Sequence, residues 1–480
     1  MDEGLKKITT RNISYNAVAT LLVAAVQFVT NVVLARVLTP ADYGIVGFAN
    51  IFIAFMMQFG DFGINNAVVQ QKELDDSTLY TAFTLKALLS SVIFLLLLFG
   101  APVTLYFMDR AEVVTVIRLL SLTFLFSVGS FLPQILLTRQ LDYRKLSVPV
   151  TVSVMAGSTL AIVMAYSGFG FWSMTANSIA VAFITAVGLN LLCPAPVLFR
   201  FDSAVAKRLL RFGGSVLIPG VIVFIIFNID NFAIGAMRGA EQLGYYAVAF
   251  SWGSMICVQL ASLFHKVLFP TFTRLQHDLP AMKKAYLTSV RYIAFLALPV
   301  NAFLLVYGRE FLIYVLGRGT ERWLPALPAF QILCLYGIFR AILEPLGNVI
   351  FGIGKPELCL KAIITVAVIE LGLLYPVIRA FGITGVAVAV TIAYLSQYLV
   401  YLPILRRELG VQGSELLREI RFALFAASIM AITMYFAKMV ITDSLPSLLA
   451  QGICAAGVYT GAYMLIDRSR LIGELKTLVK

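Results

Sequence analysis

Five ionisable residues lie deep inside long apolar stretches of the chain, where a charge is costly to hold. They are Asp61, Asp230, Arg340, Glu344 and Glu370. Residues of this kind are kept in apolar surroundings chiefly when they bind a substrate, carry a proton or cation, or pair with each other. Arg340 and Glu344 are four residues apart and share one helix face, so an internal ion pair and a functional site are equally good interpretations.

The chemistry that Arg340 could perform is the binding of a phosphate group. A guanidinium presents five N–H donors in a planar fork, which can hold a carboxylate and a phosphate oxygen together. The acids have other uses. Asp61 follows Gly60 and could cap a helix break, and we prefer that interpretation, whereas Asp230 stands between asparagines and is the better cavity-facing acid. The candidate ion-coupling or gating residues are therefore Asp61, Asp230, Glu344 and Glu370.

The composition indicates that these residues are positioned by a membrane protein. The 480 residues are 60% hydrophobic and 13% charged, with a mean hydropathy of +0.90, which a soluble domain cannot cover with polar side chains. The net charge of +12 is expected of cytoplasmic loops and gives no reason to invoke nucleic acid. The five cysteines are scattered without a CxxC pair, so no metal or cofactor is expected.

Apolar runs long enough to cross about 30 Å of hydrocarbon define the elements. Cutting these runs at charged residues, prolines and glycines predicts fourteen transmembrane helices. They lie near 13–37, 44–68, 80–105, 113–137, 147–167, 171–192, 213–237, 243–264, 288–307, 324–351, 358–378, 383–404, 422–441 and 447–466. Most of the 37 lysines and arginines then fall in loops on the side of the N-terminus, which predicts that both termini are cytoplasmic.

An internal repeat at an offset of 200 residues predicts how these helices are grouped. The segment from Asn31 through Gly44 aligns with the segment from Asn231 through Gly244, and the even number of intervening spans makes the two copies parallel. We therefore expect two parallel six-helix bundles, 1–200 and 201–410, around a central cavity. Residues 411–480 are expected to add two C-terminal helices and a cytoplasmic tail.

Several short segments resemble the Wzx-type polysaccharide flippases, of the superfamily that also holds multidrug antiporters and peptidoglycan-precursor flippases. The resemblance rests on Leu34-Ala35-Arg36, Pro40, Tyr43-Gly44, Asp61-Phe62-Gly63-Ile64, Leu268-Phe269-Pro270, Gly354-Lys355-Pro356 and Gly382-Ile383-Thr384-Gly385. The branch that the chain most resembles is the one that exports exopolysaccharides such as colanic acid. One departure is Glu344, where we would expect a small or polar residue.

The resemblance implies a substrate and a location. The expected substrate is a polyprenyl-pyrophosphate carrying an oligosaccharide repeat unit, moved from the cytoplasmic to the periplasmic leaflet of the bacterial inner membrane for surface polysaccharide or lipopolysaccharide biosynthesis. The expected partners are this lipid-linked oligosaccharide, membrane lipids and a polysaccharide polymerase. Arg340, Arg36 and Trp252 are the candidate substrate-binding residues, Trp252 because an indole could stack on a sugar ring.

Two other classes of function remain open. A cation-coupled drug or small-molecule antiporter of the same superfamily would have a cavity lined chiefly by carboxylates and aromatic rings, whereas arginines favour pyrophosphate. A membrane polysaccharide polymerase or ligase would need acids or a metal site in a large loop. The longest predicted outside loop, 308–323, has no histidine or paired aspartates, which disfavours an enzyme.

Overall fold

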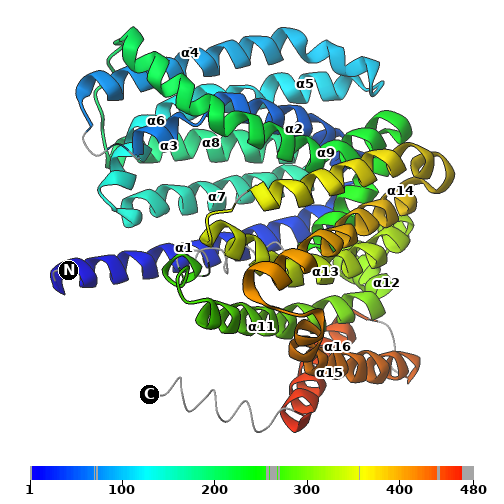
Figure 1. The fold of residues 1–480 in the computed structure, drawn as a ribbon. Helices are drawn as coiled ribbons and strands as arrows, with labels where there is room; N and C mark the ends of the chain where they lie inside the picture. Colours follow the sequence, from blue (N-terminus) through cyan, green and yellow to red (C-terminus); the bar gives the residue numbers. More distant parts are fainter. Residues whose placement is uncertain are drawn as a thin grey trace. The chain divides into compact units, whose positions relative to one another are not determined.

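A computed structural model describes residues 3–69, 71, 74–255, 259, 268, 271–355, 357–440 and 444–466 (Figure 1). The predicted cytoplasmic tail and part of the motif around Phe269 lie outside these residues. Every regular element in the described part is helical, so the predicted all-α membrane class is confirmed.

The elements of the first half are α1 (Glu3–Val37), α2 (Pro40–Asp61), α3 (Ile64–Val69), α4 (Asp76–Gly100), η1 (Ala101–Tyr106), α5 (Ala111–Leu120), α6 (Leu122–Arg139), α7 (Tyr143–Tyr166), α8 (Trp172–Leu192) and α9 (Ser203–Gly253). Those of the second half are α11 (Leu279–Val306), α12 (Gly308–Glu310), η2 (Phe311–Leu316), η3 (Glu321–Ala326), α13 (Leu327–Gly352), α14 (Glu357–Leu409), α15 (Gly413–Val440) and α16 (Leu445–Ile466).

Twelve helices in the described residues are long and apolar enough to cross a membrane. Two of them, α9 with 51 residues and α14 with 53, would each extend more than twice the ~30 Å of hydrocarbon at 1.5 Å per residue. Each is interrupted by a glycine with a positive φ, Gly239 at 82° and Gly382 at 58°, a conformation that glycine adopts readily. Both α9 and α14 are therefore two successive helices, and both breaks fall within or next to predicted gaps between spans.

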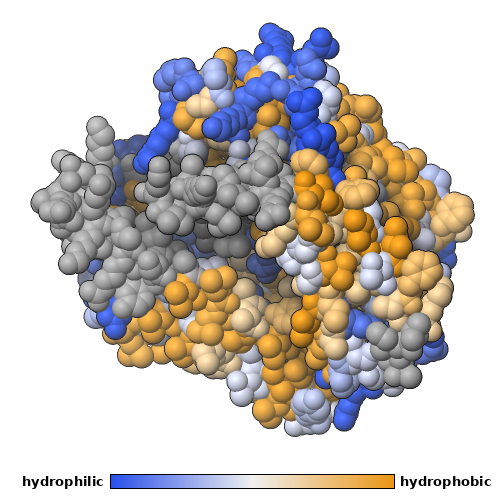
Figure 2. All heavy atoms as spheres, turned by 90° about the horizontal axis from the view of Figure 1, so that it is seen from below, coloured by the Kyte–Doolittle hydropathy of each residue, from blue (hydrophilic) through white to orange (hydrophobic). Residues whose placement is uncertain are grey.

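Large apolar side chains cover much of the surface, as Figure 2 shows for one face of the molecule. Leu191, Leu399 and Leu465 are 77%, 77% and 84% exposed. In water such a surface would be unfavourable, because burying a leucine side chain is worth about 1.5–3 kcal/mol. In a bilayer the same side chains face lipid, which is what the composition predicted.

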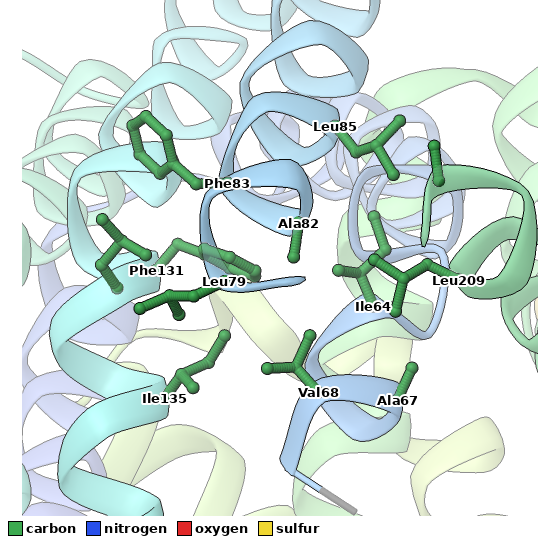
Figure 3. Packing of buried hydrophobic residues seen from close by; sticks show 12 residues of the cluster. Ile64, Ala67, Val68, Leu79, Ala82, Phe83, Leu85, Phe131, Ile135 and Leu209 are labelled. Carbon is green, nitrogen blue, oxygen red and sulfur yellow. The ribbon is translucent and has the colours of Figure 1, made fainter. Parts of the chain in front are cut away.

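The chain divides into two compact units, Met1–Gly244 and Tyr245–Lys480. The first unit thus extends past the predicted boundary at residue 200 and takes in most of α9. The reason is packing: Leu209 of α9 is buried with Ile64 of α3, Leu79 of α4 and Phe131 of α6 (Figure 3). This cluster fixes α3, α4 and α6 against one another.

The two copies of the sequence repeat contact each other reciprocally within the first unit. Pro40 begins α2, and Ala240 is the first residue after the break in α9. A Cβ on Gly44 would lie 1.7 Å from the carbonyl oxygen of Ala240, and a Cβ on Gly244 would lie 1.7 Å from that of Pro40. Positions related by the repeat therefore exchange the same contact, as a two-fold axis would produce.

The last two helices belong to the second unit. Ala423, Met430 and Tyr459 of α15 and α16 share a buried cluster with Ala294 of α11. The hydroxyl of Tyr459 donates to the carbonyl oxygen of Phe295 at 3.0 Å. These helices lie beside α11 in Figure 1, so the predicted C-terminal pair is packed on the second unit along much of its length.

Candidate functional site

Arg340 lies near the middle of α13 and is half-buried in the second unit. Its Nη1 donates to the hydroxyl of Tyr336, one turn earlier, at 3.0 Å. The guanidinium carbon also lies 5.9 Å from the centre of the Tyr336 ring and 5.7 Å from that of Tyr394. Such cation–π contacts are worth about 0.5–2 kcal/mol each, more where water is excluded.

The two tyrosine rings form the surface on which this cation lies. Tyr336 of α13 and Tyr394 of α14 are 1% and 9% exposed, and their ring centres lie 5.1 Å apart at 80°. The hydroxyl of Tyr398 donates to the carbonyl oxygen of Phe339 at 2.9 Å and joins the same two helices. Tyr336 and Tyr394 thus position a guanidinium in the middle of a membrane span, where an anionic group of a substrate would be attracted to it.

Two of the predicted acids, Glu344 and Glu370, lie in the same unit as Arg340. Glu344 is half-buried and lies one turn after Arg340 on α13. The ion pair considered from the i,i+4 spacing stays a prediction. Side chains on a helix lean toward its N-terminus, which is the direction in which Arg340 reaches Tyr336. Glu370, on α14, is 4% exposed.

Trp252 does not offer a free ring face to a sugar. It is 7% exposed and packs edge-on against Phe311, with ring centres 5.3 Å apart. A sugar would have to displace Phe311 before it could stack on the indole. Trp252 thus lies in the core of the second unit, and its stacking on a sugar stays a prediction.

The other predicted residues, Arg36, Asp61 and Asp230, lie in the first unit. Arg36 is half-buried in the last turn of α1. Asp230 of α9 is 3% exposed, and its Oδ1 accepts from the backbone N and the side-chain Nδ2 of Asn231, at 2.7 and 3.0 Å. The predicted site residues are therefore divided between the units.

Asp61 is the last residue of α2, directly before a helix break at Phe62 with φ 41°. Its Oδ1 accepts a hydrogen bond from Nδ2 of Asn65, a side chain of the next helix, at 2.7 Å. Asp61 also lines a cavity of about 400 Å³ together with Lys86. A carboxylate at a helix break was the expected arrangement, whereas the cavity was not foreseen.

Two lysines within apolar helices, Lys86 and Lys438, have partners inside the protein. Lys86 of α4 is 7% exposed, and its Nζ donates to the carbonyl oxygen of Gly60 at 2.8 Å. Lys438 of α15 forms an ion pair with Glu310 at 2.8 Å. Both ammonium groups thus have an oxygen partner within the protein. A carbonyl left open by the break after Asp61 attracts Lys86, and nothing in the sequence marks that contact.

Comparison with known proteins identifies the family. Residues 33–328, more than half of the chain, match the family described as polysaccharide biosynthesis protein. The chain belongs to this family. The family is one of transporters rather than of enzymes. The expectation of a transporter rather than an enzyme is confirmed.

Two curated relatives support the same assignment. The Escherichia coli lipopolysaccharide biosynthesis protein WzxC is 24% identical over 398 residues, which are 82% of this chain and 79% of that protein. The Rhizobium meliloti succinoglycan biosynthesis transport protein ExoT is 26% identical over 345 residues, 72% of this chain and 68% of that protein. Both relatives are named for polysaccharide biosynthesis, as the family is.

Superposition on solved structures identifies the fold of this protein. An inward-closed structure of the lipid II flippase MurJ superposes with a TM-score of 0.73 at 12% identity, over 95% of this chain and 99% of that one. An inward-facing multidrug transporter of the MATE family superposes with a TM-score of 0.64 at 16% identity, over 80% and 94%. The chain thus has the fold shared by MurJ and MATE transporters.

Proposed function

We propose that the protein moves a polyprenyl-pyrophosphate-linked oligosaccharide from the cytoplasmic to the periplasmic leaflet of a bacterial inner membrane. The observation that carries this proposal is Arg340, a cation held by Tyr336 and Tyr394 in the middle of a span. A pyrophosphate cannot cross hydrocarbon unaided, because an unpaired ion in a low-dielectric medium costs tens of kcal/mol. A fixed guanidinium lowers that cost where it is highest.

A deletion strain tests this function and its alternative together. Without the gene, surface polysaccharide should fall to background while undecaprenyl-linked repeat units accumulate in membrane extracts, because synthesis continues and translocation does not. Mass spectrometry of the lipid extract and staining of the polymer measure both. A strain that keeps its polymer and becomes more sensitive to cationic drugs would instead indicate the cation-coupled antiporter.

The direction of transport depends on topology, for which we propose fourteen spans and two cytoplasmic ends. Dividing α9 at Gly239 and α14 at Gly382 turns the twelve apolar helices into fourteen segments, and the distribution of lysine and arginine supports the orientation. A polysaccharide polymerase that receives the repeat units in the periplasm is the partner that this direction requires.

Cysteine labelling tests the proposed topology. In a variant without native cysteines, an impermeant maleimide added to intact spheroplasts should label Ser167→Cys and Thr320→Cys, because both positions are exposed and follow an odd number of predicted spans. Ser203→Cys, also exposed, should react only after the membrane is permeabilised. The opposite pattern would discard the orientation.

A further inference from the structure

The cavity in the first unit has the size and lining of a ligand site. Its volume is about 400 Å³, within the range of about 300–1,000 Å³ typical of small-molecule pockets. The polar residues that line it come from α2, α3, α4, α6 and α8 and include Asp61, Asn65, Lys86, Ser127, Ser130 and Thr185. Leu85 and Phe131 of the cluster in Figure 3 fix the segments on which Lys86 and Ser130 lie.

The cavity contains one group of each charge. The Lys86 ammonium donates to the carbonyl oxygen of Gly60, which lies at the C-terminal end of α2, where a cation is favoured by the helix dipole. The Asp61 carboxylate accepts from Asn65. A lysine has three donors and a carboxylate has about four acceptor positions, so each group can also bond to a ligand.

A buried acceptor points to a ligand that donates hydrogen bonds. Nδ2 of Asn65 is used by Asp61, and Oδ1 of Asn65 is buried with no hydrogen-bond partner in the part of the chain that the structure describes. Most buried polar atoms in proteins are hydrogen-bonded. Asn65 is one of the residues that line the same cavity, so a ligand hydroxyl that reached this oxygen would satisfy it.

The mixture of donors and acceptors decides the class of ligand. An inorganic anion beside Lys86 would face the Asp61 carboxylate, and a cation beside Asp61 would face the lysine. A polyhydroxylated ring both donates and accepts and carries no charge, so it matches both groups. Phe124 and Phe131 line the cavity as well and provide an apolar wall for the C–H face of such a ring.

We propose that this cavity binds one neutral saccharide ring, which, given the proposed function, belongs to the transported oligosaccharide. Purified protein in a detergent without a sugar headgroup should give saturation-transfer NMR signals from methyl β-D-glucoside or N-acetylglucosamine. Lys86→Gln should weaken the binding by about tenfold, as expected for one hydrogen bond to a charged group. Lys207→Gln, an exposed lysine of the same unit, should leave the binding unchanged.

A second variant separates ligand binding from the support that Lys86 gives to α2. Ala182→Leu adds volume to the cavity wall and leaves the bond between Lys86 and Gly60 intact, so it should abolish the saccharide signal in a folded protein. The proposal is overturned if wild-type protein gives no saccharide signal, if Ala182→Leu does not reduce it, or if sulfate alone binds in a Lys86-dependent way. If the saccharide-binding experiments fail but the deletion strain still accumulates lipid-linked repeat units, the proposed transport function stands and only this saccharide site is rejected.

Discussion

Gly44→Ala and Gly244→Ala should each remove most of the folded protein from the membrane. The added Cβ would lie 1.7 Å from a backbone carbonyl oxygen, that of Ala240 in one case and that of Pro40 in the other. A backbone atom at a helix start cannot rotate away as a side chain can, so the helices must separate. Overpacking of this kind costs 1–3 kcal/mol or more, and we expect about 3 kcal/mol or above at each position.

The measurement is the amount and thermal midpoint of a fluorescent fusion extracted from the membrane. Gly457→Ala and Gly461→Ala in α16 are the matched controls, because a Cβ at either position meets no atom within 4 Å; they should be neutral or stabilising by up to about 1 kcal/mol. Equal abundance of Gly44→Ala and Gly461→Ala would show that the close crossing does not exist in the membrane.

Substitution of Arg340 should abolish export while the protein stays in the membrane. Arg340→Ala removes the cation, and we expect polymer to fall at least about 100-fold, the effect of losing a charged group that stabilises the transferred anion. Arg340→Lys should keep part of the export, because the positive charge remains. Export should not be complete, because the planar fork of N–H donors is lost. Abundance should stay near wild type, because Tyr336 and Tyr394 still pack on each other, 5.1 Å apart.

Arg379 provides a matched control for this prediction. It is an exposed arginine on α14 whose guanidinium carbon lies 4.7 Å from the ring centre of Tyr375, so Arg379→Ala removes a similar contact elsewhere and should leave export unchanged. If Arg340 binds the substrate, the double variant Arg340→Ala with Glu344→Ala should behave as the single one, because removal of Glu344 does not restore the cation. Recovery of export in the double variant would contradict a role of Arg340 in substrate binding.

The membrane helices could be predicted because lipid leaves few alternatives. Every backbone group must find a partner within the helix, so length and hydropathy suffice. Gly239 and Gly382 mark, in the sequence, the positions at which α9 and α14 are interrupted. The repeat was visible because Gly44 and Gly244 must both be glycine for the same steric reason.

The side-chain partners could be predicted less well. Arg340 has Tyr336 at i−4 and Glu344 at i+4, and only the lean of side chains toward the helix N-terminus favours the tyrosine. Lys86 bonds to a carbonyl 26 residues away in the sequence, at a helix end that forms after Asp61. Spacing along one helix carries no information about such a contact, so the cavity around Lys86 appears only in three dimensions.

Lipid translocation by the purified protein tests the central claim most directly. Proteoliposomes would be loaded with undecaprenyl-pyrophosphate-linked repeat units from the deletion strain, and an enzyme added outside would cleave only the saccharides in the outer leaflet. Wild-type protein should make the protected half of the lipid accessible within minutes, whereas Arg340→Ala should leave it protected, as in liposomes without protein. Equal protection with wild-type protein and with empty liposomes, under an imposed proton or sodium gradient as well as without one, would contradict the account.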